Sequence, residues 1–191
     1  MEREGRPCAC CWPATARRIG TRRQIQGASD VPPNARGREQ ARSLAERVRR
    51  ERVGAIYSSP LSRARETAEI IGKTLGVNVI TAPELTELSF GDWEGCTWEE
   101  IGERWPKQFA LYAEDRERYA PPNGESYAGM LSRAWPFVER LRRAPGRGAL
   151  CVCHSAVMRG IIAREDGLTV NESYIRLKLP NGSLVELKSL V

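Results

Sequence analysis

The stretch Ala149-Leu-Cys-Val-Cys-His154-Ser155-Ala156-Val-Met-Arg159 joins an apolar run to a predicted helix through the only histidine of the chain. Residues 149–153 predict a short buried strand, and a helix is expected over about residues 156–165. Open α/β sheets bind their ligands in the loops that follow the strands. His154 is therefore a candidate site residue.

Strands and helices alternate along the chain after residue 30. Further strands are predicted at 54–58 and 77–80, and helices at about 35–50, where Asn34 is the cap, and 61–75. Residues 97–143 are expected to be mostly helical around a loop at 121–124, with Pro136 kinking the last helix. Two strands joined by Asn181-Gly182 are expected to follow. The alternation predicts an α/β fold with a mostly parallel sheet.

Two other loops that follow predicted strands carry charged residues. Ser58-Ser-Pro-Leu-Ser-Arg63-Ala-Arg-Glu-Thr67-Ala enters a helix, so backbone N–H groups and Arg63 can meet an anion together. Leu85-Thr-Glu87-Leu-Ser-Phe-Gly91-Asp-Trp93-Glu-Gly95 places a carboxylate ahead of a turn rich in glycine. Taken singly, an arginine, a glutamate and a histidine are more often surface or structural residues, so the functional argument depends on their combination.

In order and spacing, this combination resembles the histidine phosphatase superfamily, also called phosphoglycerate-mutase-like, from about Gln26 to Val191. The matching segments are Gln26-Gly27, Asp30-Val-Pro, Asn34-Ala-Arg-Gly37, Gln40-Ala41, Ser59-Pro-Leu-Ser-Arg63-Ala, Glu66-Thr-Ala68, Glu87 to Gly95, Gly124-Glu-Ser126, His154 and Asn181-Gly-Ser183. In texture the chain looks most like α-ribazole phosphatases and broad bacterial phosphatases.

The resemblance implies a three-layer α/β/α domain with a mixed, mostly parallel sheet, and a phosphohistidine mechanism. In that mechanism a nucleophilic histidine attacks the phosphoryl group, two arginines and a second histidine hold its oxygens, and a glutamate protonates the leaving oxygen. Carried onto this chain, Arg63, His154 and Ser155 bind phosphate, His154 and Glu87 are catalytic, and Glu87 is the acid. No metal or cofactor is required, because phosphoryl transfer depends mainly on positioning and charge neutralisation.

The family's first motif, Arg-His-Gly-Glu/Gln-Thr-x-Trp-Asn at the end of an apolar strand, is missing. Its place holds Cys8-Ala-Cys-Cys-Trp-Pro-Ala-Thr-Ala-Arg-Arg-Ile-Gly-Thr21, which has no histidine and is implausible as a buried strand. Read one frame over, Cys10 and Cys11 each give leucine, and the Trp12–Pro13 junction gives alanine. Permitted codons at the following junctions give Arg-His-Gly-Glu-Thr-Asp-Trp-Asn.

The histidine codon of the shifted frame spans Ala14 and Thr15. We therefore hypothesise a frameshift that begins before about Cys8 and is compensated near Arg22, arising either from an error in the gene sequence or from a genuine lesion. A disrupted first strand predicts a destabilised or insoluble product. The chain is expected to be one domain over residues 1–191, with residues 1–25 as an aberrant N-terminal segment.

Composition weighs against several other classes of function. Residues 1–50 carry 12 arginines against 5 acidic residues, but no motif or interleaved aromatics support nucleic-acid binding. Cys8, Cys11, Cys151, Cys153 and His154 offer zinc ligands without the usual paired spacing, so inert reduced thiols are favoured. No run resembles a membrane span or a secretory signal, so we expect a cytoplasmic protein without a membrane partner.

The expected activity is hydrolysis of a small phosphorylated metabolite. Phosphatase is favoured over phosphoglycerate-mutase-type phosphotransfer, because the chain has no room for the longer insertions typical of those mutases. A catalytically dead phosphoester-binding relic is the alternative from another class, since the chain retains Arg63, Glu87 and His154 but not the nucleophile. The sequence leaves the substrate and the oligomeric state open, a homodimer being one candidate.

Overall fold

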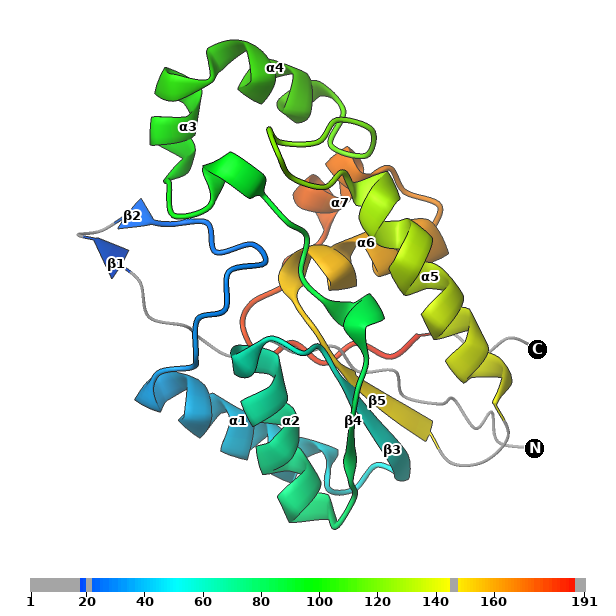
Figure 1. The fold of residues 1–191 in the computed structure, drawn as a ribbon. Coiled ribbons are helices and arrows are strands. Elements are labelled where there is room, and N and C mark those ends of the chain that lie inside the picture. Colours follow the sequence, from blue (N-terminus) through cyan, green and yellow to red (C-terminus); the bar gives the residue numbers. More distant parts are fainter. Residues whose placement is uncertain (1–17, 20–21, 145–147, 188–191) are drawn as a thin grey trace.

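A computed structural model describes residues 18–19, 22–144 and 148–187 of the chain, and its centre is a parallel sheet (Figure 1). Three strands, β3 (Val53–Ser58), β4 (Val79–Thr81) and β5 (Gly148–Val152), lie in the order β4-β3-β5, and both pairings are parallel. In register, Tyr57 faces Ile80 on one side and Cys151 on the other. The predicted parallel sheet is confirmed among the described residues.

Alternate residues of the strands supply two separate hydrophobic cores, one on each face of the sheet. Ile56, Leu150 and Val152 pack with α1 (Ala35–Val48) and α2 (Ser62–Leu75). Tyr57 and Cys151 face the other core, which includes α5 (Tyr127–Arg143) and α6 (Ser155–Glu165). Successive strand residues point to opposite faces, so this division gives the predicted three-layer α/β/α arrangement, with helices on both sides of the sheet (Figure 1).

Local sequence signals set the ends of these helices. Asn34 caps α1 by accepting from Gly37 N, as expected, and Ser126 caps α5 by accepting from Gly129 N. α2 ends at Gly76, whose φ of 68° lies in the left-handed region that glycine adopts at low cost. Pro136 lies inside α5, which runs unbroken to Arg143.

The segment between β4 and α5 forms a smaller aromatic layer beyond the carboxyl ends of the strands (Figure 1). It contains the short turns η1 (Pro83–Leu85) and η2 (Gly91–Trp93) and the helices α3 (Trp98–Arg104) and α4 (Pro106–Glu114). The Trp93 ring packs edge-on against Tyr112 at 5.2 Å between centroids, and both side chains are fully buried. This layer packs against the core that contains α5 and α6.

The prediction of two strands around Asn181-Gly182 is wrong. These two residues form a turn, but no strand occurs between residues 177 and 187. The chain instead forms α7 (Val170–Arg176), which begins with a capping box between Thr169 and Glu172. α7 extends to Arg176, so part of the chain before the Asn181-Gly182 turn is helical rather than extended.

Two short strands, β1 (Arg18–Ile19) and β2 (Arg22–Arg23), pair antiparallel near the start of the described chain. Residues 1–17 and 20–21 of the predicted aberrant segment, which include Cys8 and Ala14-Thr15, lie outside the described residues. Within the described part of the chain, no helix combines the length and the apolar character needed to cross a bilayer.

Candidate active site

The charged residues predicted for the site follow the three parallel strands at the same edge of the sheet. Ser59 and Arg63 follow β3, Glu87 lies in the segment after β4, and His154 follows β5. The carboxyl ends of parallel strands meet at one edge, so residues far apart in sequence come together here (Figure 1).

Arg63 is a buried side chain that contacts two other segments of this site. It lies in the first turn of α2 with only 4% of its surface exposed. Its Nη2 donates to the Gly27 carbonyl at 2.6 Å, its Nη1 to the Ser29 carbonyl at 2.8 Å and its Nε to His154 at 3.2 Å. Of the five N–H groups of a guanidinium, these bonds leave two without an acceptor among the described residues, as a phosphate clamp requires.

His154 is 1% exposed and bonded through both ring nitrogens. Its Nδ1 accepts from Arg63, and its Nε2 lies 2.7 Å from the Ser59 hydroxyl. Burial, with the positive charges of Arg63 and Arg133, holds the pKa of the imidazole well below its usual range. In the structure as it stands, His154 is a neutral ring fixed in orientation.

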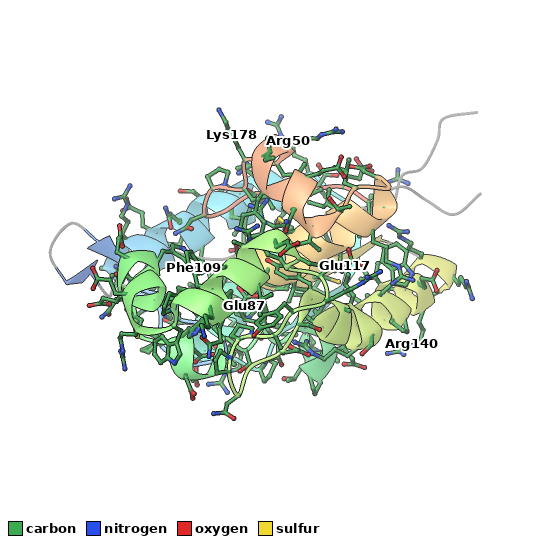
Figure 2. All side chains as sticks on the ribbon, turned by 90° about the horizontal axis from the view of Figure 1, so that it is seen from above. Arg50, Glu87, Phe109, Glu117, Arg140 and Lys178 are labelled. Carbon is green, nitrogen blue, oxygen red and sulfur yellow. The ribbon has the colours of Figure 1, made fainter. Side chains whose placement is uncertain are left out.

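Glu87 is half-buried, and its carboxylate lies at the start of α6. Both carboxylate oxygens accept from Ala156 N, at 3.2 and 3.3 Å, and Oε1 also accepts from Leu88 N. Burial raises the pKa of Glu87, against the opposing effect of these N–H donors and of Arg63. Seen from above in Figure 2, Glu87 lies near the centre of the molecule, whereas Arg50, Arg140 and Lys178 lie at its outline.

Arg133 fixes the segment that carries Glu87. Its Nη1 donates to the carbonyls of Glu84 and Thr86 at 2.7 and 2.8 Å, and its Nη2 pairs with Glu125 at 2.8 Å. Glu125 belongs to the Gly124-Glu-Ser126 motif singled out in the sequence. That motif therefore supports the acid loop as well as starting α5.

Three further contributors to the site, Ser59, Asp30 and Glu94, lie within the matching segments, but the sequence assigned them no role of their own. Asp30 accepts from Ser62 N at 2.7 Å and from the Ser62 hydroxyl at 2.8 Å, which supplies the N-terminal cap that α2 otherwise lacks. Glu94 binds backbone N–H groups of residues 28 and 29. Asp30 and Glu94 contact segments more than 30 residues away, so no local spacing in the sequence indicates their role in the site.

The remaining predicted residues are less informative. Ser155 is the half-buried first residue of α6. Cys151 and Cys153 are fully buried, whereas Cys8 and Cys11, the other thiols of the alternative zinc site, lie outside the described residues. Within the ranges that the structure describes, no group of three or more histidine, cysteine, aspartate or glutamate residues is placed to hold a metal ion.

The sequence matches the family model described as histidine phosphatase superfamily (branch 1) over residues 14–189. Among curated proteins it is similar to the 6-phosphofructo-2-kinase/fructose-2,6-bisphosphatase of Gallus gallus, with 38% identity over 136 residues. That alignment covers 70% of this chain and 28% of the relative. The chain thus spans less than a third of the length of that curated protein.

Two solved structures have similar folds over nearly the whole chain. The mycobacterial glucosyl-3-phosphoglycerate phosphatase is 27% identical with a TM-score of 0.80, over 93% of this chain and 87% of that one. The alpha-ribazole phosphatase of Shigella flexneri is 26% identical with a TM-score of 0.73, over 87% and 88% of the two chains. All three proteins carry the name of a phosphatase, but each name specifies a different substrate.

Proposed function

The chain belongs to the histidine phosphatase superfamily, and from this premise we propose that it hydrolyses the phosphomonoester of a small metabolite through a phosphohistidine intermediate. The observation that carries the proposal is the direct contact of buried Arg63 with buried His154, at the strand edge that also holds Glu87. A buried cation beside an imidazole suits a site that neutralises phosphate oxygens.

In this mechanism the described residues position the phosphoryl group and supply a proton. The two N–H groups of Arg63 that have no acceptor among the described residues hold two phosphate oxygens, and His154 holds another by turning its Nε2–H from the Ser59 hydroxyl to the phosphate. The nucleophilic histidine nitrogen forms a bond to phosphorus as the P–O bond to the leaving group breaks, and protonated Glu87 gives its proton to the leaving oxygen. A water molecule then attacks phosphorus, its proton passes to Glu87, and the N–P bond of the phosphohistidine breaks.

The nucleophile of this scheme is the histidine of the shifted reading frame, at the position of Ala14-Thr15. The sequence contains one histidine, His154, and the mechanism assigns it to the flank of the phosphate. We therefore propose that the chain as its sequence stands is impaired in turnover and that the frame-restored chain is the active enzyme. Losing the nucleophile of a catalytic unit costs on the order of a million-fold in rate.

A second function, a phosphoester-binding protein without turnover, is favoured by the same single-histidine observation. Arg63, Glu87 and His154 keep their connections in the present chain, so binding can persist without the chemistry. The different substrates named in the three relatives leave the metabolite open. Hydrolysis is preferred to phosphoglycerate-mutase-type transfer because the names of all three relatives include a phosphatase activity.

The test compares two proteins in a p-nitrophenyl phosphate assay near neutral and mildly acidic pH. One is the present chain, and the other, the repaired chain, has residues 8–21 replaced by the translation of the shifted frame. Turnover by the repaired chain alone, with acid-labile phosphate trapped on its new histidine, is the expected result. Arg63→Gln in the repaired chain is the matched control for phosphate binding.

If both proteins fold but neither hydrolyses the ester, binding of orthovanadate decides between the two functions. Saturable binding to the present chain, weakened by Arg63→Gln, would favour the binding protein. Phosphohistidine mapped to His154 in the present chain would contradict the proposed role of that residue.

A further inference from the structure

Glu94 is the residue that follows η2, and its carboxylate accepts hydrogen bonds from a loop 65 residues earlier in the chain. Oε1 accepts from Ala28 N at 2.8 Å and from Phe90 N at 3.0 Å. Oε2 accepts from Ser29 N at 2.9 Å and from the Ser29 hydroxyl. One half-buried carboxylate therefore binds two successive N–H groups of loop 27–29 together with the backbone of its own turn.

The same loop holds Arg63 from its other side. The carbonyls of Gly27 and Ser29 accept from Nη2 and Nη1 of Arg63, and Nε of Arg63 reaches His154. In a trans peptide the carbonyl and the N–H point in opposite directions. When Glu94 binds Ala28 N–H, the Gly27 carbonyl in the same peptide plane therefore points away from Glu94, toward Arg63.

The local backbone is built for this close approach. Gly27 has a φ of 52°, and a Cβ at that position would overlap the Glu94 carboxylate. Next to it, Ile25 N donates to Cys96 O at 2.9 Å and Gly95 N donates to Ile25 O at 2.8 Å. The two segments are thus paired along their backbones, and the carboxylate of Glu94 fills the space that a side chain at residue 27 would take.

We propose that Glu94 is a positioning residue, which orients loop 27–29 so that its carbonyls hold Arg63 against His154. The chain of contacts runs from Glu94 Oε1 through the Gly27–Ala28 peptide to Arg63 and then to His154. A hydrogen bond to the N–H polarises the peptide and strengthens the bond made by its carbonyl. That this arrangement serves phosphate binding rests on the proposed function. The contacts between Glu94, loop 27–29, Arg63 and His154 are independent of it.

The experiment measures the protonation and tautomer of the His154 ring by NMR. Because the sequence holds one histidine, the two ring nitrogens in an untagged ¹⁵N-labelled protein give signals that need no assignment by mutation. Spectra are recorded against pH for the present chain, Glu94→Gln and Glu94→Ala. Glu84→Gln is the matched control. The Glu84 carboxylate pairs with the exposed side chain of Arg140 at 3.4 Å and contacts neither loop 27–29 nor Arg63.

In Glu94→Ala, the expected result is loss of the fixed ring tautomer and titration of His154 at higher pH than in the parent. The charged neighbours that hold the pKa of His154 down are Arg63 and Arg133, and only Arg63 depends on loop 27–29. Glu94→Gln should be intermediate, because its amide oxygen can still accept from Ala28 and Phe90 but not from Ser29 N. Orthovanadate affinity should fall about tenfold or more in Glu94→Ala, the effect of losing one charged hydrogen bond.

A purely structural role would lower the unfolding midpoint and leave the His154 spectrum of the folded protein unchanged. That result in Glu94→Gln, which keeps the shape of the side chain, would overturn the proposal even if Glu94→Ala does not fold. Failure of the parent to bind orthovanadate would count against the proposed function alone. A changed His154 tautomer in Glu94→Gln would still support the positioning role.

Discussion

Arg63 Nε donates to His154 Nδ1 at 3.2 Å, and this contact fixes which nitrogen of His154 carries the proton. A guanidinium nitrogen only donates, so Nδ1 is unprotonated. The proton of the neutral ring is then on Nε2, which donates to the Ser59 hydroxyl at 2.7 Å. The buried pair therefore presents one permanent positive charge and one neutral ring, a site prepared for an anion that brings its own negative charge.

The first prediction concerns the titration of His154. In the free protein its signal should show a pKa well below the ordinary range, because burial and the charges of Arg63 and Arg133 disfavour the imidazolium. Adding inorganic phosphate should raise that pKa, since the dianion offsets both arginines. Imidazole NMR against pH, with and without phosphate, measures both. An ordinary pKa in the folded free protein would contradict the described geometry.

The second prediction is the pH dependence of stability. His154 is neutral when folded, whereas in the unfolded chain it protonates near its ordinary pKa, so the unfolded state binds more protons in mildly acidic solution. Stability from this group is thus complete above about pH 6.5 and is lost at up to about 1.4 kcal/mol per pH unit below it. Urea unfolding at pH 7.5, 6.5 and 5.5 should give a flatter profile for His154→Asn. If the free energy of unfolding changes with pH equally in the parent and in His154→Asn, then His154 does not cause the pH dependence.

The third prediction separates proton donation by Glu87 from its structural bond to Ala156. In the repaired chain, Glu87→Gln keeps an oxygen that accepts from Ala156 N but has no acidic proton. Hydrolysis of an alkyl phosphate, whose leaving oxygen needs a proton, should fall by about 10²–10⁴-fold. Hydrolysis of p-nitrophenyl phosphate should fall much less. Equal losses in kcat for both esters would argue against general-acid catalysis by Glu87.

The parts of the fold that follow local rules could be predicted from the sequence. α2 has apolar residues at helical spacing and Gly76 at its end, and the strand before His154 is a continuous apolar run. The two strands predicted around Asn181-Gly182 do not form: these residues make a turn without flanking strands, and the Thr169-x-x-Glu172 capping box starts a helix just before them.

The site could be predicted as far as its charged residues and no further. Arg63, Glu87 and His154 stand at strand ends, and the order of strands in a parallel sheet brings them together. Their supports act through backbone groups of remote loops, as Glu94 does with Ala28 and Arg133 with Thr86. Such contacts leave no periodicity or spacing in the sequence, so they emerge only from the three-dimensional arrangement.

The last prediction tests the turn that follows Glu87. Gly91 has a φ of 52°, and a Cβ there would overlap the backbone of residues 122–124, where Asp92 N also donates to Pro122 O at 3.0 Å. Gly91→Ala should therefore lower the free energy of unfolding by more than the roughly 1 kcal/mol expected for a left-handed residue alone, because two backbone segments must separate. Gly182→Ala is the matched control, with a φ of 76° and no atom within 4 Å of the added Cβ.

Urea unfolding of both variants gives the comparison. A larger loss in Gly91→Ala, accompanied by weaker orthovanadate binding, would show that the turn holds the acid loop against the site, whereas equal losses would leave backbone conformation as the only cost.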